Sequence, residues 1–467
     1  MAIQTDYTQI GFSVAESAFG TAAELAATDA FRFTDLTITP NEERLGRNDV
    51  RPGSRSKEAS ITGKRSVEGA FTIDDAPSGT VGTVVDIDPL YLTAYGKATN
   101  AGTYTVQAAP APSTTGCTVN DSTGLSIGDL VSVPCADENG VSVAIAVCIS
   151  NIATNALTWA PALPNTPAAA ATIRSGIQYS LSAANTASAT VYKYYGIDSA
   201  NYHADLVECA AGVVVGKWEY DIDPGGLAVV AASFAAKDLA RFMAMGVNED
   251  VAADETDWDV DDCLSEIHTA GRCTFIMGTD AVSDETVICT ATDSNNDIVT
   301  VSRNANGAGA GTYDADDSMY PFYPGATTGG SAVAGILGRI YFGGTKYDIT
   351  AAKVTHVEGK ALRTDTFGDA TATGIVSAAQ REVTVELTGY LTSDEDRWQI
   401  ADRKTATAVW VQAGTTQGSI HAWYLPTVEF DMPAISGAKG EEIPLTLRGA
   451  AYAPTGSPET ELRHAYL

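Results

Sequence analysis

The histidines are the residues best suited to metal binding or proton transfer, but their spacing forms no recognisable site. The chain has five, at positions 203, 268, 356, 421 and 464. No two of them have the HExxH or HxH spacing that brings two imidazoles to one metal ion. The GxSxG, GxxxxGK[ST] and GxGxxG motifs are also absent. We therefore expect no catalytic residue, no cofactor and no metal site, and we do not expect an enzyme.

One acidic run resembles the start of a calcium-binding loop. It reads Asp257-Trp-Asp-Val-Asp-Asp262. It lacks the glycine at the sixth position and the glutamate at the twelfth that complete such a loop, so a solvated helix start is the preferred interpretation. The glycine-rich run at 307–311 follows no apolar strand, which favours a turn over a phosphate cradle.

The concentrated basic stretch of the chain is a long polar loop at 41–65. Its basic residues are Arg44, Arg47, Arg51, Arg55, Lys57, Lys64 and Arg65. The loop could be solvated, could reach an acidic surface on a neighbouring copy, or could contact nucleic acid. A basic arm offsets the repulsion between identical acidic subunits. A structureless loop of this length in a compact domain is usually either functional or disordered until it is bound.

The overall charge is strongly acidic. The 467 residues include 28 Lys and Arg against 58 Asp and Glu, for a net charge of −30. This balance excludes typical sequence-specific DNA binding, which needs a basic surface to neutralise phosphates. Hydrophobic residues make up 45% of the chain, enough for a sizeable core.

Cysteine usage and targeting signals indicate a protein made in a cytoplasm. The seven cysteines form no CxxC pair, so we expect reduced and mostly buried thiols; a disulfide within either cluster, 117–148 or 263–289, is the alternative. Residues 1–20 have no basic and apolar signal-peptide pattern, and no apolar stretch is long enough for a membrane helix.

Alternating polar and apolar residues predict a mainly β fold. In Ser66–Asp74 one face holds Val67, Phe71 and Ile73, and in Glu382–Thr388 it holds Val383, Val385 and Leu387. Such strands pack one face on a core and expose the other. Four short helices are expected at Asp88–Tyr95, Ala236–Met245, Asp257–Thr269 and Ser393–Lys404, the second from the spacing of Leu239, Phe242 and Met243.

The order of predicted elements repeats once along the chain. Arg65-Ser-Val-Glu aligns with Arg381-Glu-Val-Thr, each after a strand and a long polar loop. Each half then has a short helix, a Trp-containing strand (at Trp218 and Trp423) and a last strand. This pattern predicts a duplicated fold with two inserted small domains. The expected divisions are 1–100 plus 176–248, an Ig-like β insert at 101–175, a very acidic insert at 249–330, and a second half at 331–467.

Three segments together resemble the tail tube proteins of long-tailed bacteriophages of the siphophage type. They are Ile10-Gly-Phe-Ser-Val-Ala-Glu-Ser-Ala-Phe-Gly-Thr21, Arg65-Ser-Val-Glu-Gly69 leading to Asp88-Pro-Leu-Tyr-Leu92, and Pro426-Thr-Val-Glu-Phe-Asp-Met-Pro433 with the following Ile443–Tyr452. The resemblance covers residues 1–100, 176–248 and 331–467. It implies a tube-type β-sandwich or barrel fold, which in this family is often decorated by extra β domains.

The resemblance implies a virion protein whose stacked rings of six folds form a tube for DNA ejection. A duplicated chain predicts a trimeric ring with pseudo-sixfold symmetry, and a true hexamer is the alternative. The loop with Arg44, Arg47, Arg51, Arg55 and Lys57 would reach the adjacent ring, and Glu68, Glu382 and Glu386 would line an acidic lumen. Tape measure and tail terminator proteins are the implied partners, with transient passage of DNA and no membrane.

Three other functions compete with this interpretation. A head decoration or capsid protein is the nearest, although a typical capsid protein would have a long helix. A glycan-binding surface protein would bring a secretion signal and clustered aromatic residues. A glycan-degrading enzyme would need two carboxylates in a cleft, which the spacing of 58 acidic residues cannot identify.

Overall fold

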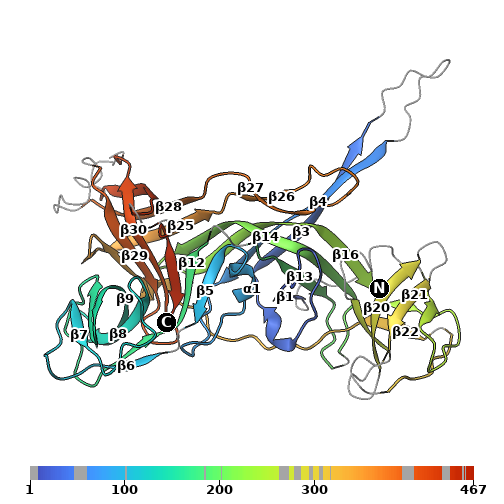
Figure 1. Cartoon of the computed structure of the whole chain (residues 1–467), viewed down its shortest axis with the longest axis horizontal. Helices are drawn as coiled ribbons and strands as arrows, with labels where there is room; N and C mark the ends of the chain where they lie inside the picture. Colours follow the sequence, from blue (N-terminus) through green and yellow to red (C-terminus); the bar gives the residue numbers. More distant parts are fainter. Residues whose placement is uncertain are drawn as a thin grey trace.

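The computed structural model has a mainly β fold, as predicted from the alternating segments. It describes residues 9–46, 60–99, 102–182, 186–200, 202–261, 273–277, 285–293, 298–303, 309–315, 317–391, 404–433, 442–454, 457 and 459–467. A large twisted sheet forms an arch across the middle, and a smaller six-stranded sheet lies at each end (Figure 1). The hairpin formed by β3 (Asp35–Leu45) and β4 (Ile61–Asp74) projects away from the body as an arm.

The first half of the chain contributes one set of antiparallel strands to the large sheet. Its main elements are β1 (Gln9–Ala15), β2 (Ala30–Phe31), β3 (Asp35–Leu45), β4 (Ile61–Asp74), α1 (Asp88–Tyr91), β5 (Tyr95–Thr99), β12 (Ile177–Leu181), β13 (Ala189–Tyr195), β14 (Leu206–Ile222), β15 (Val229–Ala236) and β16 (Asp238–Met243). The pairings run β1–β13–β14–β15–β4–β3, and β16 also pairs with β14.

The second half repeats this arrangement. Its elements are β23 (Arg339–Phe342), β24 (Thr345–Lys346), β25 (Ile349–Val357), β26 (Lys360–Arg363), β27 (Gly374–Ser377), β28 (Glu382–Tyr390), β29 (Thr407–Ala413), β30 (His421–Phe430), β31 (Pro444–Ala451) and β32 (Arg463–Tyr466). The pairings run β23–β29–β30–β31–β28–β25, and β32 also pairs with β30. Six pairings therefore recur in the same chain order.

The register of the strands repeats as well. Val67 lies opposite Ala236, and Val383, which is 316 positions after Val67, lies opposite Ala451. The β13–β14 and β29–β30 ladders both carry a register shift at the corresponding place. The alignment of Arg65 with Arg381 is thus the structural one. The two Trp-containing strands also correspond, but Trp218 and Trp423 occupy different positions along them.

The two small sheets share one topology. The first contains β6 (Thr103–Thr105), β7 (Gly116–Thr118), β8 (Leu130–Ala136), β9 (Ser142–Ala153), β10 (Ala156–Ala160) and β11 (Thr172–Ser175). The second contains β17 (Met245–Gly246), β18 (Asp257–Asp259), β19 (Cys273–Met277), β20 (Thr286–Asp293), β21 (Ile298–Ser302) and β22 (Ser318–Pro321). The orders are β6-β11-β8-β9-β10-β7 and β17-β22-β19-β20-β21-β18, so each strand has a counterpart. We refer to them as the first and second modules.

The modules pack crosswise on the two halves. The first module, which interrupts the first half, shares a core with Tyr341, Trp410 and Tyr424 of the second half. The second module shares a core with Phe12, Tyr192 and Cys209 of the first half. These two sets occupy corresponding register positions in the duplicated fold. The modules therefore sit on equivalent faces of the two halves.

One of the four predicted helices is wrong, a second is wrong at its start, and a third is shorter than expected. The segment at 236–245 contains β16, whose residues pair with the first part of β14, so tertiary pairing overrides its helical spacing. The segment at 257–269 begins as β18, where Trp258 is buried opposite Val299, while 262–269 lie outside the described residues. The helix at 88–95 ends at Tyr91. The prediction for 393–404 falls on residues outside the description, apart from Lys404.

Candidate functional site

The candidate site is the part of the large sheet that runs without a break through both halves. Its eight strands follow the order β3-β4-β15-β14-β25-β28-β31-β30. The second part of β14 pairs with β25. This pair joins the four strands of the first half to the four strands of the second half within the sheet. β3 pairs with β4 and, in the part of the chain that is described, with no other strand.

One face of this sheet is apolar and packs on the main core. The six hydrophobic residues singled out from the sequence are all buried there: Val67, Phe71, Ile73, Val383, Val385 and Leu387. Trp218, Tyr220 and Trp423 pack in the same core. Burial of these side chains supplies the main drive for holding the two halves together.

The opposite face is polar and carries more acids than bases. Glu68 and Glu382 are exposed on it, and Glu386 is half-buried beside Arg448, whose Nε lies 3.0 Å from Glu386 Oε2. Small residues such as Thr72, Ala231 and Thr384 separate the charges. The acidic residues on this face are Asp35, Glu68, Asp74, Glu219, Asp221, Glu382, Glu386 and Glu429, and the basic ones are Lys217, Lys353 and Arg448.

A buried ion cluster lies where the two halves meet. Glu358 accepts from Lys360 Nζ at 3.1 Å and from Arg381 Nε at 3.1 Å, and His356 Nε2 lies 2.9 Å from its carboxylate. Burial opposes ionisation of Glu358, but the three basic side chains around it overcome that penalty and lower its pKa. Lys360 also donates to the carbonyl of Thr93 in the first half, so the cluster bridges the junction.

A second buried network links the halves through histidines. His421 Nδ1 lies 2.7 Å from Asp75 Oδ2, and its Nε2 lies 3.1 Å from His464 Nδ1. Tyr466 donates to the other oxygen of Asp75. Burial lowers the pKa of His464 well below the usual range, and the neighbouring His421 and His356 lower it further. These groups are almost completely buried, and we assign them a structural role.

The predicted basic arm is only partly described. Arg44 is an exposed residue near the end of β3, and its guanidinium lies 3.5 Å from Glu42. Arg47, Arg51, Arg55 and Lys57 lie outside the described residues. At the base of the arm, Lys64 Nζ donates to the carbonyls of Thr366 and Asp369, beyond the end of β26.

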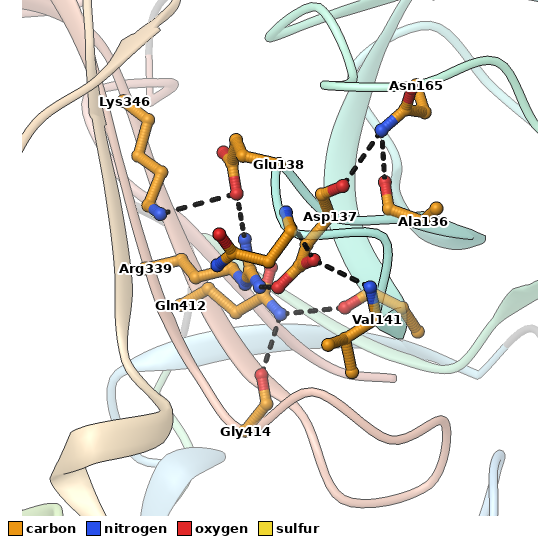
Figure 2. A network of polar contacts seen from close by, with 11 residues as sticks. Ala136, Asp137, Glu138, Val141, Asn165, Arg339, Lys346, Gln412 and Gly414 are labelled. Carbon is orange, nitrogen blue, oxygen red and sulfur yellow. Dashed lines mark hydrogen bonds and ion pairs between the residues drawn. The ribbon is translucent and has the colours of Figure 1, made fainter.

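A polar clamp holds the first module on the second half (Figure 2). Arg339 of β23 lies 3.3 Å from Asp137 and 3.5 Å from Glu138, and Lys346 also approaches Glu138. Gln412 of β29 accepts from the amide of Ala146 and donates to the carbonyl of Ala144. No local pattern of residues indicates this clamp, because its partners lie about 200 or more positions apart in the chain.

Residues that the sequence analysis considered for metal binding or disulfides lie in strands or in buried positions of the structure. Among the described residues, no three His, Cys, Asp or Glu side chains gather where they could hold a metal ion. Asp257 and Asp259, from the acidic run, belong to the strand β18, and Asp259 Oδ1 accepts from Asn248. Cys117, Cys135, Cys148 and Cys209 are free and buried, and Cys289 is buried; the side chains of 263 and 273 lie outside the description.

No protein-family model matches this chain, and no curated protein matches it. No helix within the described ranges has both the length and the apolar character needed to cross a bilayer.

Proposed function

We propose that this chain is a structural subunit of the tail tube of a long-tailed bacteriophage, in which copies assemble into stacked rings around a channel for DNA. The observation that carries the proposal is the β14–β25 junction. There, an antiparallel strand pair joins the sheet of one half to the sheet of the other. We take this pair as the model for how halves of neighbouring chains join side by side.

The same junction can be repeated between chains. β3 occupies in the first half the place of β25 in the second, and its outer edge is open in the described structure. An open edge of this length is a template for pairing with another strand, and ring closure removes all such edges. Three copies supply six equivalent halves. The duplication therefore favours a trimeric ring with pseudo-sixfold symmetry over a true hexamer.

The polar face of the sheet suits the wall of a DNA channel. Glu68, Glu382 and Glu386 lie on the side opposite the core, and the face as a whole has an excess of acids. Such a wall repels phosphates and offers them few cations to bind, although physiological salt confines the repulsion to about 8 Å. On this proposal the protein is made in the bacterial cytoplasm and resides in the virion tail, with tape measure and terminator proteins as further partners.

Electron microscopy of the purified protein, with rotational averaging of end views, tests the proposal. We expect tubes whose rings have six lobes with a threefold modulation. Smooth sixfold rings would support the tube function and contradict the trimer. Particles that coat heads, or specific binding to a glycan array without polymers, would instead support a head decoration protein or a glycan-binding protein and overturn the proposal.

A further inference from the structure

The ion cluster at the junction between the halves has a counterpart at the free edge of the sheet. By the 316-residue correspondence, Glu42, Arg44 and Arg65 take the places of Glu358, Lys360 and Arg381. Arg44 contacts Glu42 as Lys360 contacts Glu358, and Arg65 lies opposite Glu42 in the β3–β4 ladder. The charges and their order along the chain are thus the same.

The two clusters differ in burial. The side chains of Glu358 and Lys360 are 1% and 6% exposed, whereas those of Glu42 and Arg44 are 37% and 73% exposed. The difference arises because the first half covers the second cluster: the Glu358 amide donates to the carbonyl of Gly216. Nothing within the described chain covers the first cluster in this way.

The segment that follows the buried cluster shows how such an arm is accommodated. The β26–β27 hairpin runs along the large sheet toward β4 (Figure 1). Lys360, Ala361 and Leu362 line a crevice of about 340 Å³ against β4, β14 and β15 of the first half. The amide of Arg65 donates to the carbonyl of Ala370 beyond it. The β26–β27 hairpin of the second half therefore lies across the first half.

The corresponding part of the β3–β4 arm carries uncovered apolar side chains. Leu45 and Ile61 lie opposite each other in the ladder and are 50% and 57% exposed. Leu45 corresponds to Ala361, which is half-buried in the crevice. Exposed aliphatic residues beside an exposed ion cluster indicate a surface that another protein covers.

The surface that would receive the arm can be identified from the same correspondence. Val214 and Gly216 in the crevice of the first half correspond to Glu429 and Asp431 in the second half, and both acids are exposed. Arg448, paired with Glu386, replaces Ser233. The crevice that receives Lys360 contains one carboxylate, Glu68, and the cation of Arg44 would face two, Glu429 and Asp431, which is a complementary arrangement.

We propose that the base of the β3–β4 arm, with Glu42, Arg44 and Leu45, docks across β30 and β31 of a second copy of this chain. The arm then lies on its neighbour within one ring, in the place that the β26–β27 hairpin takes on the first half. This inference deepens the proposed function and rests on it, because the docking requires that copies of the chain assemble side by side. It concerns the described base of the arm, whereas contact with an adjacent ring was expected of the loop beyond it.

A disulfide cross-link tests the docking register. Lys217 and Val357 are partners in the β14–β25 ladder, and they correspond to Met432 and Asn41. Both latter residues are exposed. A chain with Asn41→Cys and Met432→Cys should give covalent dimers and trimers on oxidation, seen on non-reducing gels. The matched controls are each single variant and Asn41→Cys with Glu429→Cys, which is out of register and should give far less.

A charge exchange tests the chemistry of the contact. Arg44→Glu should weaken association at least about tenfold, measured by light scattering at low and high salt. Combining it with Glu429→Arg and Asp431→Arg should restore association. Asp121→Lys, an exposed reversal on the first module, is the matched control and should assemble normally. Circular dichroism of the monomer confirms that each variant is folded.

The outcomes separate this inference from the proposed function. Rings that form in the wild type but are unaffected by Arg44→Glu, with no in-register cross-link, would overturn the inference and leave the tube function in place. Cross-links without rings would support the docking and count against the tube. The absence of both rings and cross-links over a wide concentration range would contradict both proposals.

Discussion

His421 Nδ1 lies 2.7 Å from Asp75 Oδ2, which bonds the first residue of β30 to the residue that follows β4. The two are 346 positions apart, and both side chains are almost fully buried. Asp75 also accepts from Tyr466 near the C-terminus and bonds through its amide to Ala228. One residue therefore ties together the start, middle and end of the duplicated fold, through its carboxylate and its backbone amide.

Replacing this carboxylate should destabilise the protein strongly. Asp75→Leu leaves His421 and Tyr466 buried without their acceptor, and we expect a loss of about 3 kcal/mol in the free energy of unfolding. Urea unfolding followed by circular dichroism measures it. Asp254→Leu, at an exposed acid of the second module, is the control and should change stability by less than about 0.5 kcal/mol. Equal stability of the two variants would contradict the assigned role.

Stability should fall in mild acid because of buried histidines. Burial lowers the pKa of His464 and His356 below the ordinary value of 6.5, so the unfolded chain binds more protons below that value than the folded one. The contribution is complete above pH 6.5 and is lost as the pH falls. We expect a slope of about 1.4 kcal/mol per pH unit for each histidine. Urea unfolding between about pH 7.5 and 5.5 measures it.

The matched variant for this pH effect is His464→Gln. Its absolute stability will be lower, because the ring of His464 stacks on Tyr179 with centroids 4.8 Å apart. The informative quantity is the slope, which should be shallower than in the wild type. An unchanged slope would show that His464 does not titrate as proposed.

The first module should loosen when its clamp is removed. Arg339→Met leaves Asp137 without its buried partner, and we expect a cost of about 2 kcal/mol. Lys346→Met removes a more exposed contact to Glu138 and should cost less than about 1 kcal/mol. Proteolysis of the module and urea unfolding report the difference. A double-mutant cycle with Asp137→Asn isolates the pair, and a coupling near zero would refute the clamp.

Gly69 in β4 lies where even an added methyl group should destabilise the protein. Gly69 lies opposite Phe234, whose ring occupies the space of a Cβ there, and such a Cβ would also lie 2.7 Å from the carbonyl oxygen of Thr37. Gly69→Ala should therefore cost about 2 kcal/mol in unfolding free energy. Gly226→Ala is the control, because a methyl group added at Gly226 would have no other atom within 4 Å. A neutral Gly69→Ala would show that the ring can move aside.

Under the proposed function, the acidic face of the sheet predicts how strongly assembled tubes bind DNA. Glu68→Lys with Glu382→Lys should leave the core side of the sheet untouched and make tubes retain DNA, with an affinity that falls steeply with salt. A filter-binding assay at two salt concentrations measures retention. Wild-type tubes, and tubes with a reversed charge at Asp121, should bind little. Equal retention by all three would contradict a channel lined by this face.

The sequence could predict the strands and the repeat because both leave local signals. Alternation in Ser66–Asp74 identified the buried face, and the alignment of Arg65 with Arg381 identified the register. The strand at Asp238–Met243 could not be recognised, since its apolar residues have helical spacing and only its pairing with β14 makes it a strand. The Asp75–His421 bond joins residues hundreds of positions apart and has no local signature.

The crosswise packing of the modules has a consequence for the exterior of a ring. Both modules share one topology and sit on equivalent faces, yet the second lies in the most acidic part of the chain. Three copies would thus present six similar protrusions whose electrostatic character alternates. A ligand that senses shape would find six equal sites, whereas a cationic one would find three, so the outer surface could be decorated at two different densities without any change in the tube.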